Sequence, residues 1–389
     1  MNNNSSYDCI VIGAGIIGTT IAMYLSEAGK KVLIMDKGII GNGTTANTFA
    51  WINATSKTNN PSYFALNLSG LKEYESLSRR YGSDNTGFNR SGMIDIVSDR
   101  DPGVLSLLHK KSNAIQELNC RAQILTDSEI RALEPAITVQ NGDSALYCID
   151  DAWLDVETYL SFVKKQLTRY SVEVCENTEA TKLTLDETGR VNGIETTNGH
   201  YTTENIIIAT GSAFSSTLAE LTDYPPYENR FPMQTAPGLL LRIPEKSMSE
   251  PLTCVTYINN SDGLHFRPMK DGGCLAGSDY TDGLVSFSQD QESQERAADH
   301  LLEAVKEYVP GINPDTFIND CYWGIGVRSV PLDDQSILGP IEGSDGLILA
   351  CTHSGITLAP IIGKLISEYL VDDKIPEGMQ PFLFKRFTD

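Results

Sequence analysis

The first forty residues contain two short apolar runs that are separated by a glycine-rich turn and a helical pattern. Residues 8–12 form a β-branched run that leads directly into Gly13-Ala14-Gly15-Ile16-Ile17-Gly18. Apolar residues then recur at helical spacing as far as Ala28, and Gly29 follows as a helix-ending residue. A second apolar run ends at Asp36. Strand, glycine turn, helix and strand within about 30 residues predict a βαβ unit.

Helical and strand-like patterns alternate through the rest of the chain. Apolar positions at helical spacing predict helices at residues 61–81, 104–118, 127–133, 155–170, 292–308 and 358–370. Short apolar runs between polar turns predict strands at residues 90–97, 172–174, 182–185, 191–196, 200–202, 206–209 and 347–350. Residues 231–287 alternate strand-like runs with Gly, Pro and Asp turns, which indicates an antiparallel sheet.

Elements of the βαβ type lie at both ends of the chain and flank this antiparallel material. The pattern therefore predicts a mixed α/β fold (with α+β character) in which a Rossmann-type domain is built from separated segments and a second, antiparallel-sheet domain is inserted. We assign residues 1–85, 145–220 and 325–389 to the Rossmann-type domain, and residues 86–144 and 221–324 to the inserted domain.

The motif Gly13-x-Gly15-x-x-Gly18 has a specific physical use. A pair of phosphates must approach backbone amides at a helix N-terminus, where a Cβ would clash and the helix dipole favours negative charge. Asp36 ends the second strand 18 residues past Gly18, where a carboxylate can accept hydrogen bonds from ribose hydroxyls. A purely structural glycine turn is the alternative, but the strand, the helix and the acid are all in place and favour a dinucleotide site.

The loop Gly41-Asn42-Gly43-Thr44-Thr45-Ala46-Asn47 follows the second strand. Glycines there let the backbone approach a pyrophosphate a second time, and the threonine hydroxyls can donate hydrogen bonds to it. A polar surface loop is the alternative interpretation. These local motifs alone do not distinguish NAD from FAD.

Two later motifs complete an ordered set: Ala209-Thr210-Gly211 at the end of a strand, and Gly355-Ile356-Thr357-Leu358-Ala359-Pro360 at the start of the last helix. In this order, over essentially the whole chain, the motifs resemble the D-amino-acid oxidase-like superfamily of FAD enzymes, which includes glycine oxidase and sarcosine oxidase. The resemblance implies FAD as cofactor, and an inserted domain that binds the substrate. It implies cofactor contacts by Gly13, Gly15, Ile16, Ile17, Gly18, Asp36, Lys37, Gly43, Thr44, Thr45, Gly211, Gly355, Ile356 and Thr357.

In that superfamily the adenosine lies at the first βα turn, and the last helix points its N-terminus toward the isoalloxazine ring. The positive end of the helix dipole would stabilise negative charge on N1 and the C2 carbonyl of reduced flavin. Asp36 stands where the superfamily usually has Glu. We expect it still to reach the ribose, at some cost in affinity.

Residues 324–339 resemble the superfamily segment in which an Arg and a Pro- and Asp-containing turn precede a strand ending in Gly. The resemblance implies that Arg328 pairs with the substrate carboxylate, because a guanidinium fits a carboxylate bidentately and stays charged when buried. A structural ion pair is the alternative. Ser329 replaces a common Pro, and residues 334–336 replace a Gly-containing turn, which weakens the transfer of one particular substrate.

Relatives that attach their flavin covalently use a Cys in this segment. Gly326 occupies that position here, and Cys321 lies five residues earlier, where we interpret it as structural. The sequence therefore predicts non-covalent FAD.

His353 lies in the loop that resembles the flavin-facing turn of the superfamily, and we predict that it is catalytic together with Arg328. A structural histidine is a close alternative. His265, Tyr257 and Trp51 are the main candidates for the substrate wall, although aromatic residues on strands more often belong to the core. Weaker candidates are Arg267, Tyr280, Tyr322 and Trp323.

Composition limits the other function classes. The formal net charge of −21 repels nucleic-acid phosphates and anionic lipids, so neither is an expected partner. The eight cysteines are scattered without a CxxC pair, so we expect no metal site and mostly free thiols. Few residues precede the first apolar strand, and no run of ~20 apolar residues occurs, so we expect no signal peptide and no integral membrane segment. A cytoplasmic enzyme is the default expectation, and an oligomer is compatible with the sequence.

The combined hypothesis is an FAD-dependent oxidoreductase that oxidises the C–N bond of a small carboxylate-bearing amine, an α-amino or N-alkyl amino acid. Hydride would pass to flavin N5, and the imine product would hydrolyse in water. Three alternatives stay open at this point: an FAD-dependent 2-hydroxy-acid dehydrogenase of the same fold, a nicotinamide-dependent dehydrogenase, and a flavin-binding subunit of a larger complex.

Overall fold

The predicted βαβ unit is present at the start of the chain. It consists of β2 (Cys9–Ile12), α1 (Ile16–Glu27) and β3 (Val32–Met35), and the two strands pair in parallel. The computed structural model describes residues 6–97, 102–222, 232–287, 290–310, 312 and 322–387. All eight residues of these two strands are buried, which is the pattern of a parallel sheet that is covered on both faces.

A six-stranded sheet extends this unit in the order β10-β3-β2-β14-β21-β20. Its first five strands are parallel, and the edge strand β20 is antiparallel to its neighbour. The strands contributed by later segments are β10 (Glu173–Cys175), β14 (Ile206–Ile208), β20 (Ile337–Pro340) and β21 (Leu347–Cys351). Segments far apart in the sequence thus form one Rossmann-type sheet, as predicted.

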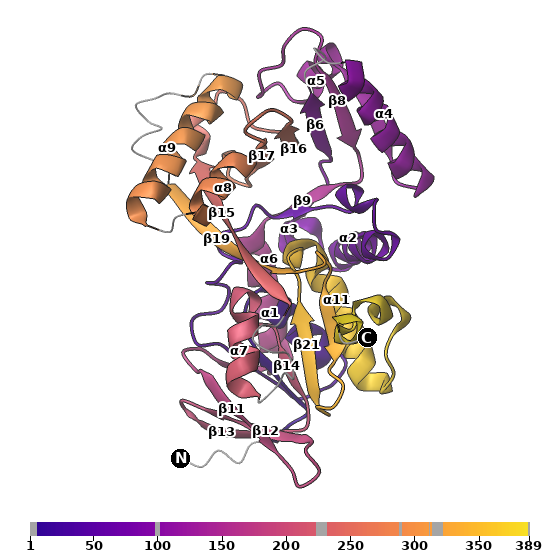
Figure 1. Ribbon diagram of the computed structural model, residues 1–389, viewed down its shortest axis with the longest axis vertical. Coiled ribbons are helices and arrows are strands. Elements are labelled where there is room, and N and C mark those ends of the chain that lie inside the picture. Colours follow the sequence, from indigo (N-terminus) through magenta and orange to yellow (C-terminus); the bar gives the residue numbers. More distant parts are fainter. Residues whose placement is uncertain are drawn as a thin grey trace.

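Helices cover one face of this sheet, and a small second sheet with one helix covers the other (Figure 1). The first layer contains α1, α2 (Pro61–Tyr81), α6 (Val156–Arg169) and α11 (Gly355–Asp372). The second contains α7 (Phe214–Leu221) and a four-stranded sheet of β1 (Ser6–Tyr7), β13 (Gly199–Thr203), β12 (Val191–Thr196) and β11 (Ala180–Leu185).

An eight-stranded sheet forms the other half of the molecule, in the upper part of Figure 1. All its neighbouring strands are antiparallel except β16 and β6, which are parallel. In sheet order they are β19 (Tyr322–Pro331), β15 (Met233–Ile243), β18 (Cys274–Ser278), β17 (Leu264–Pro268), β16 (Val255–Ile258), β6 (Met93–Val97), β8 (Ser144–Cys148) and β7 (Ala122–Thr126). The helices that the structure describes in this half are α4 (Pro102–Glu117), α5 (Asp127–Leu133), α8 (Asp279–Phe287) and α9 (Gln291–Tyr308).

Short elements connect the two halves and complete the chain. A three-stranded sheet in the order β4-β9-β5 contains β4 (Trp51–Ile52), β9 (Ala152–Leu154) and β5 (Phe88–Asn89). The remaining helical turns are η1 (Thr55–Lys57), α3 (Ser83–Thr86), η2 (Gly211–Ala213), η3 (Glu245–Ser247), η4 (Glu377–Phe382) and η5 (Phe384–Phe387).

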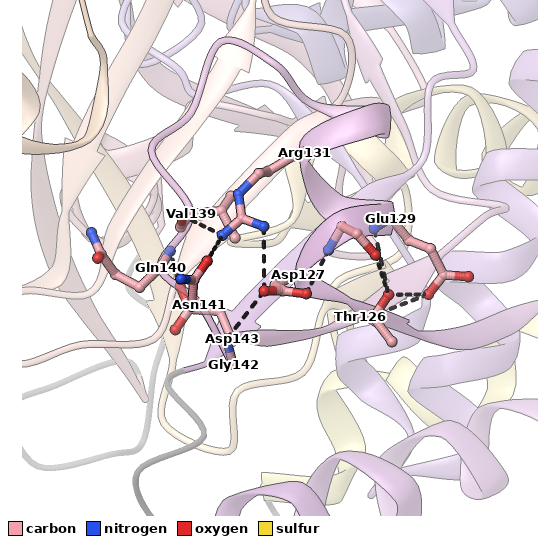
Figure 2. Close-up of polar contacts among 10 residues, drawn as sticks. Thr126, Asp127, Glu129, Arg131, Val139, Gln140, Asn141, Gly142 and Asp143 are labelled. Atoms are coloured by element: carbon pink, nitrogen blue, oxygen red, sulfur yellow. Dashed lines mark hydrogen bonds and ion pairs between the residues drawn. The ribbon is translucent and has the colours of Figure 1, made fainter.

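Helix α5 shows how local side chains fix an edge of the eight-stranded sheet (Figure 2). Thr126 accepts a hydrogen bond from the Glu129 amide, and the Glu129 carboxylate accepts one from the Thr126 amide, which is a complete capping box. Asp127 pairs with Arg131 and accepts from the Gly142 amide. The helix and the loop before β8 are thereby tied together.

The structure corrects three details of the predicted organisation. The predicted boundaries at residues 145 and 325 fall inside β8 and β19, both of which are strands of the eight-stranded sheet. The stretch 231–287, predicted as sheet only, ends in the helix α8. The sequence of α8 has apolar positions at helical spacing, but it also contains Gly283, Asp279 and Asp282, which are typical turn residues and conceal the helix. The last helix begins at Gly355, three residues before the predicted start.

Candidate functional site

A cavity of about 750 Å³ runs from the glycine turn after β2 to the edge of the eight-stranded sheet. This volume lies within the ~300–1,000 Å³ that is typical of ligand and cofactor sites. Its walls come from the loop after β3, the ends of β14 and β21, the start of α11, and parts of β15, β17, β19 and α8. Segments of both halves of the chain therefore form one site.

The glycine turn is closely packed against the end of β14. Gly13 has φ +103°, and a Cβ there would overlap the carbonyl oxygen of Ala209. A Cβ on Gly18 would overlap the carbonyl oxygen of Gly13. Only glycine therefore fits at these two positions, and α1 starts directly at the edge of the cavity. Gly15 lines the cavity itself.

The N-terminus of α1 is suited to an anion. Its N-cap residue, Gly15, supplies no side-chain cap, and no acidic residue lies in its first turn. Ile16 and Ile17 line the cavity there, and the Ile16 amide donates to Thr45 Oγ1 over 3.1 Å. The positive end of the helix dipole thus faces the cavity, where a phosphate would be stabilised.

Asp36 is fixed by the main chain on both sides. Its Oδ2 accepts a hydrogen bond from the Ala14 amide over 2.7 Å, and its Oδ1 accepts one from the Gly38 amide over 2.8 Å. An ionised carboxylate has about four acceptor positions, so it can still accept from ribose hydroxyls. Asp36 and the neighbouring Lys37 both line the cavity.

The loop after β3 lies along the cavity, and its two threonines differ in what they can offer a phosphate. Thr44 donates its hydroxyl hydrogen to the Val327 carbonyl over 2.5 Å, so this hydrogen is not available to a phosphate. The Thr45 hydroxyl accepts from Ile16, which leaves its hydrogen for donation. At Gly43 a Cβ would meet no described atom within 4 Å, and the residue lines the cavity.

The start of α11 forms a second helix N-terminus on the cavity. Gly355, Ile356 and Thr357 line it, together with Gly211 at the end of the β14 segment. Among the residues that the structure describes, α11 also begins without a side-chain cap and without an acid in its first turn. Thr357 donates to the Trp51 carbonyl over 3.3 Å, which joins the helix start to β4. Negative charge on a bound ring would be favoured here.

His353 is held as a neutral imidazole beside this helix start. Its Nε2 lies 3.2 Å from the Asp334 carbonyl oxygen, and its Nδ1 lies 3.3 Å from Ser354 Oγ. Because a carbonyl can only accept, we assign the proton to Nε2. Burial lowers the pKa of His353 to about 4, and the nearby Lys57 ammonium acts in the same direction. His353 is thus uncharged at neutral pH.

Arg328 lines the cavity where the eight-stranded sheet borders it, and it already has a partner. Its Nη2 lies 2.8 Å from Asp282 Oδ2, and its Nε donates to the Ala236 carbonyl over 3.3 Å. The Arg328 side chain is 47% exposed, whereas that of Asp282 is 18% exposed. Burial raises the pKa of Asp282, and the guanidinium of Arg328 opposes that rise. Arg328 therefore forms the ion pair that was the alternative interpretation, and it also lines the cavity.

An aromatic group forms the wall beside this pair. The rings of Tyr257 and His265 are stacked with centroids 6.1 Å apart, and Phe49 meets His265 edge-on at 4.7 Å. Tyr257 donates its hydroxyl to Asp279 Oδ2 over 2.6 Å. Burial lowers the pKa of His265, so this ring is neutral. Trp51 lines the same cavity.

Four of the weaker substrate-wall candidates lie away from the cavity, and their placement there was wrong. Arg267 is buried against the Trp153 ring. Tyr280 is exposed and contacts His300, and Tyr322 is also exposed. Trp323 packs against the core of the eight-stranded sheet. The last two lie about five or six residues before Arg328 on β19, which places them roughly 17–20 Å from it. Cys321 lies outside the described residues.

Four further residues line the cavity without having been predicted from the sequence: Asp279, Asp282, Phe49 and Lys57. The signal that could have indicated the two aspartates is their spacing of three residues, which places both on one face of a helix. That signal was hidden because the stretch was interpreted as sheet.

The structure adds two negative observations. Within the described part of the chain, no group of three or more His, Cys, Asp or Glu side chains is arranged to hold a metal ion. None of the helices in the described ranges is both long and apolar enough to cross a membrane.

An extended dinucleotide with a redox-active ring fits this arrangement. One end of the cavity offers a glycine turn at a helix N-terminus and a fixed carboxylate, which suit a pyrophosphate and a ribose. The other offers a second uncapped helix N-terminus beside an aromatic wall. FAD has each of the groups that these features would bind.

Comparisons with known proteins agree with this geometry. Residues 8–369 match the family described as FAD dependent oxidoreductase (DAO). A glycine oxidase of Geobacillus kaustophilus is 24% identical over 392 residues, covering 98% of this chain and 97% of that protein. The hydrogen cyanide synthase subunit HcnC of Pseudomonas aeruginosa is 23% identical over 429 residues, covering 99% and 97%. The crystal structure of glycine oxidase from Geobacillus kaustophilus matches with a TM-score of 0.80 at 21% identity, covering 98% of this chain and 99% of that one.

Proposed function

The chain belongs to the FAD dependent oxidoreductase family (DAO), and from this premise we propose that it oxidises the C–N bond of a small amine that carries a carboxylate. The substrate class is an α-amino or N-alkyl amino acid. A relative that matches over nearly its whole length is named glycine oxidase, and glycine is an α-amino acid. The fold and the cofactor class predicted from the sequence are confirmed.

The observation that carries the proposal is the position of Arg328. Its half-exposed guanidinium lines the same cavity as the two helix N-termini that suit the cofactor. A guanidinium on the wall of a cofactor cavity is a receptor for an anionic substrate, and a carboxylate matches its planar fork. The uncharged rings of His265, Tyr257 and Trp51 complete the wall and exclude water from the amine.

FAD, held without a covalent bond by the residues of the glycine turn, the Gly43–Thr45 loop and the start of α11, would supply the oxidant. The protein's own residues would bind the carboxylate, orient the Cα–H bond and keep water away. His353 would contribute as a neutral hydrogen-bonding group beside the α11 N-terminus, because its proton is already donated to the Asp334 carbonyl. The imine product would then hydrolyse in water.

The test is an anaerobic panel of D-, L- and N-methyl amino acids, with loss of flavin absorbance as the readout. We expect at least one amino acid to bleach the flavin, and Arg328→Gln to raise its apparent Kd by about 100-fold. Arg296→Gln is the control, because the partners described for this exposed arginine of α9, Glu292 and Ser293, both belong to its own helix. An unchanged affinity in Arg328→Gln would overturn the role of Arg328.

The same experiment separates the alternatives when 2-hydroxy acids are added to the panel. In a 2-hydroxy-acid dehydrogenase, hydroxy acids would bleach the flavin and no amine would. The similarity to a hydrogen cyanide synthase subunit keeps a subunit of a larger assembly as the second candidate. In that case the protein should bind FAD, but no small amine should bleach the flavin until another protein chain is added.

A further inference from the structure

Asp282 is built into the substrate end of the cavity as a partner of Arg328. The Leu239 amide donates to Asp282 Oδ1 over 2.9 Å, which leaves Oδ2 to face the guanidinium at 2.8 Å. Gly238 provides the space: a Cβ there would lie 3.1 Å from one Asp282 oxygen and 3.4 Å from Arg328 Nη2. The carboxylate is therefore held in place from the main chain of β15.

This partner changes what Arg328 can bind. A substrate that brings only a carboxylate must share the guanidinium with Asp282, and two carboxylates on one guanidinium repel each other. A substrate that also brings an ammonium group can satisfy both members of the pair. The Arg328 side chain is 47% exposed, so its guanidinium still has N–H groups that can donate to a substrate carboxylate.

The neighbouring groups single out Asp282 rather than Asp279. Asp279, on the same helix, accepts the Tyr257 hydroxyl over 2.6 Å. His265, on β17, is held through Nδ1 by the Gly263 carbonyl at 3.0 Å and is neutral. Asp282 is the less exposed of the two carboxylates and faces Arg328 directly.

We propose that Asp282 and Arg328 together form a receptor for a zwitterion, in which Arg328 takes the substrate carboxylate and Asp282 takes the ammonium group and accepts one of its protons. This inference rests on the proposed function and narrows its substrate class to amines that bind in the protonated form. The burial that raises the pKa of Asp282 supports it, because a carboxylate with a raised pKa is a better proton acceptor.

The proposed step is a simple proton transfer. One N–H bond of the ammonium breaks and leaves its electron pair on the nitrogen, a lone pair of Asp282 forms one O–H bond, and no oxidation state changes. The amine is then uncharged and its nitrogen lone pair can support loss of the Cα hydrogen in the oxidation proposed above. A neutral Asp282 also releases Arg328 to the substrate carboxylate.

The experiment compares two ligands that differ only in the group of interest. 2-Aminoisobutyrate has no Cα–H bond, so it cannot be oxidised, and pivalate replaces its ammonium with a methyl group. Binding of each to the FAD-loaded protein is measured from the change in flavin absorbance. In the wild type we expect 2-aminoisobutyrate to bind about 10-fold or more tightly than pivalate.

Asp282→Asn should move the two affinities in opposite directions. Binding of 2-aminoisobutyrate should weaken by about 10-fold, and binding of pivalate should tighten by about 3-fold or more, because Arg328 loses its competing anion. A structural role would weaken both. Asp279→Asn, the matched control on the same helix, should leave the ratio of the two affinities unchanged, and Asp282→Glu should keep the preference for 2-aminoisobutyrate.

The outcomes separate this inference from the proposed function. If amino acids bleach the flavin but the wild type binds pivalate as tightly as 2-aminoisobutyrate, the zwitterion receptor is wrong and the proposed function stands. If Asp282→Asn weakens both ligands equally, the receptor is also wrong. If the wild type binds neither ligand and no amino acid bleaches the flavin, both proposals are overturned.

Discussion

The amide nitrogen of Ala14 lies 2.7 Å from Asp36 Oδ2, so the carboxylate at the end of β3 also holds the main chain of the glycine turn. The two segments that would contact the adenosine are thus connected before any cofactor binds. Asp36→Asn should weaken FAD binding by about 10- to 100-fold, since it removes the charge-assisted acceptor from both the turn and the ribose. The Kd is measured by quenching of FAD fluorescence.

Asp36→Glu is the matched control, because it keeps the charge and restores the residue usual in the superfamily. We expect this variant to bind FAD within a few-fold of the wild type. An Asp36→Asn protein with the wild-type Kd would show that Asp36 has only a structural role.

Gly18 makes the turn sensitive to a single methyl group. Because a Cβ at Gly18 would overlap the Gly13 carbonyl oxygen, neither backbone segment can move aside without disturbing the other. Gly18→Ala should lower the free energy of unfolding by about 2–4 kcal/mol and weaken FAD binding. Urea denaturation of the apoprotein measures the first effect.

Gly283→Ala is the control in this case. It lies in α8, and among the described residues a Cβ there would meet no atom within 4 Å. This variant should be as stable as the wild type or more stable by about 0.5–1 kcal/mol. Equal destabilisation of both variants would contradict the packing argument for Gly18.

The buried carboxyl of Asp151 should make stability depend on pH. Burial raises its pKa to about 7, and the hydrogen bond from Thr55 at 2.8 Å opposes the shift. Between the unfolded pKa of about 3.9 and pH 7 the folded state holds more protons, so stability falls as pH rises through this window. The free energy of unfolding of Asp151→Asn should therefore rise relative to that of the wild type as the pH rises. The change in this difference between pH 4 and pH 8 should be on the order of 3 kcal/mol.

The adjacent Asp150 gives the opposite sign. It pairs with Arg121 and Arg90, and hydrogen bonds from Arg121 help to hold its pKa below the ordinary value against the effect of burial. Asp150→Asn should lose about 1 kcal/mol at every pH between 5 and 8. Urea denaturation at several pH values measures both variants. A flat difference for Asp151→Asn would show that this carboxyl is already ionised near pH 5.

Arg386, close to the C-terminus, should position His353 from a distance. Its guanidinium makes a bidentate pair with the Asp333 carboxylate, at 2.6 and 3.1 Å. The next residue of that turn is Asp334, whose carbonyl oxygen accepts the hydrogen bond from His353. Arg386→Gln should cost about 1–3 kcal/mol of stability and lower the pKa of His353 further, because the released turn no longer holds the Asp334 carbonyl oxygen, whose hydrogen bond raises that pKa. NMR titration of His353 measures the second effect.

Lys385→Gln is the neighbouring control. Lys385 forms an exposed ion pair with Glu342, and such pairs contribute about 0–1 kcal/mol. We expect little change in stability and none in the His353 titration. If Arg386→Gln leaves that titration unchanged, the C-terminal turn does not act on His353.

The parts of the molecule that the sequence predicted are those with local causes. The glycine turn, α1 and β3 follow from hydrophobic period and from a motif within 30 residues, and α2 follows from apolar positions at helical spacing. The order of these motifs was enough to predict the fold class and the cofactor. Asp36 could be placed because it directly follows a strand of the same unit.

The substrate end depends on contacts between distant segments. Arg328 and Asp282 are 46 residues apart, and their meeting requires the pairing of β15 with β19 and the presence of α8. No period in the sequence indicates which end of a strand borders a cavity, so Arg267 and Tyr322 could not be separated from His265. The strands β4, β5 and β9 have only two or three residues each, which is too short for a pattern.

The hydrogen bond from Thr44 to Val327 joins the cofactor loop to the strand that carries Arg328. A ligand that orders one of these segments reduces the entropy that remains to be lost when the other is ordered. Linkage then requires reciprocity: an analogue bound at Arg328 must lower the Kd of FAD by the same factor by which FAD lowers the Kd of that analogue. Thr44 would be the residue through which occupancy of one half of the site is communicated to the other.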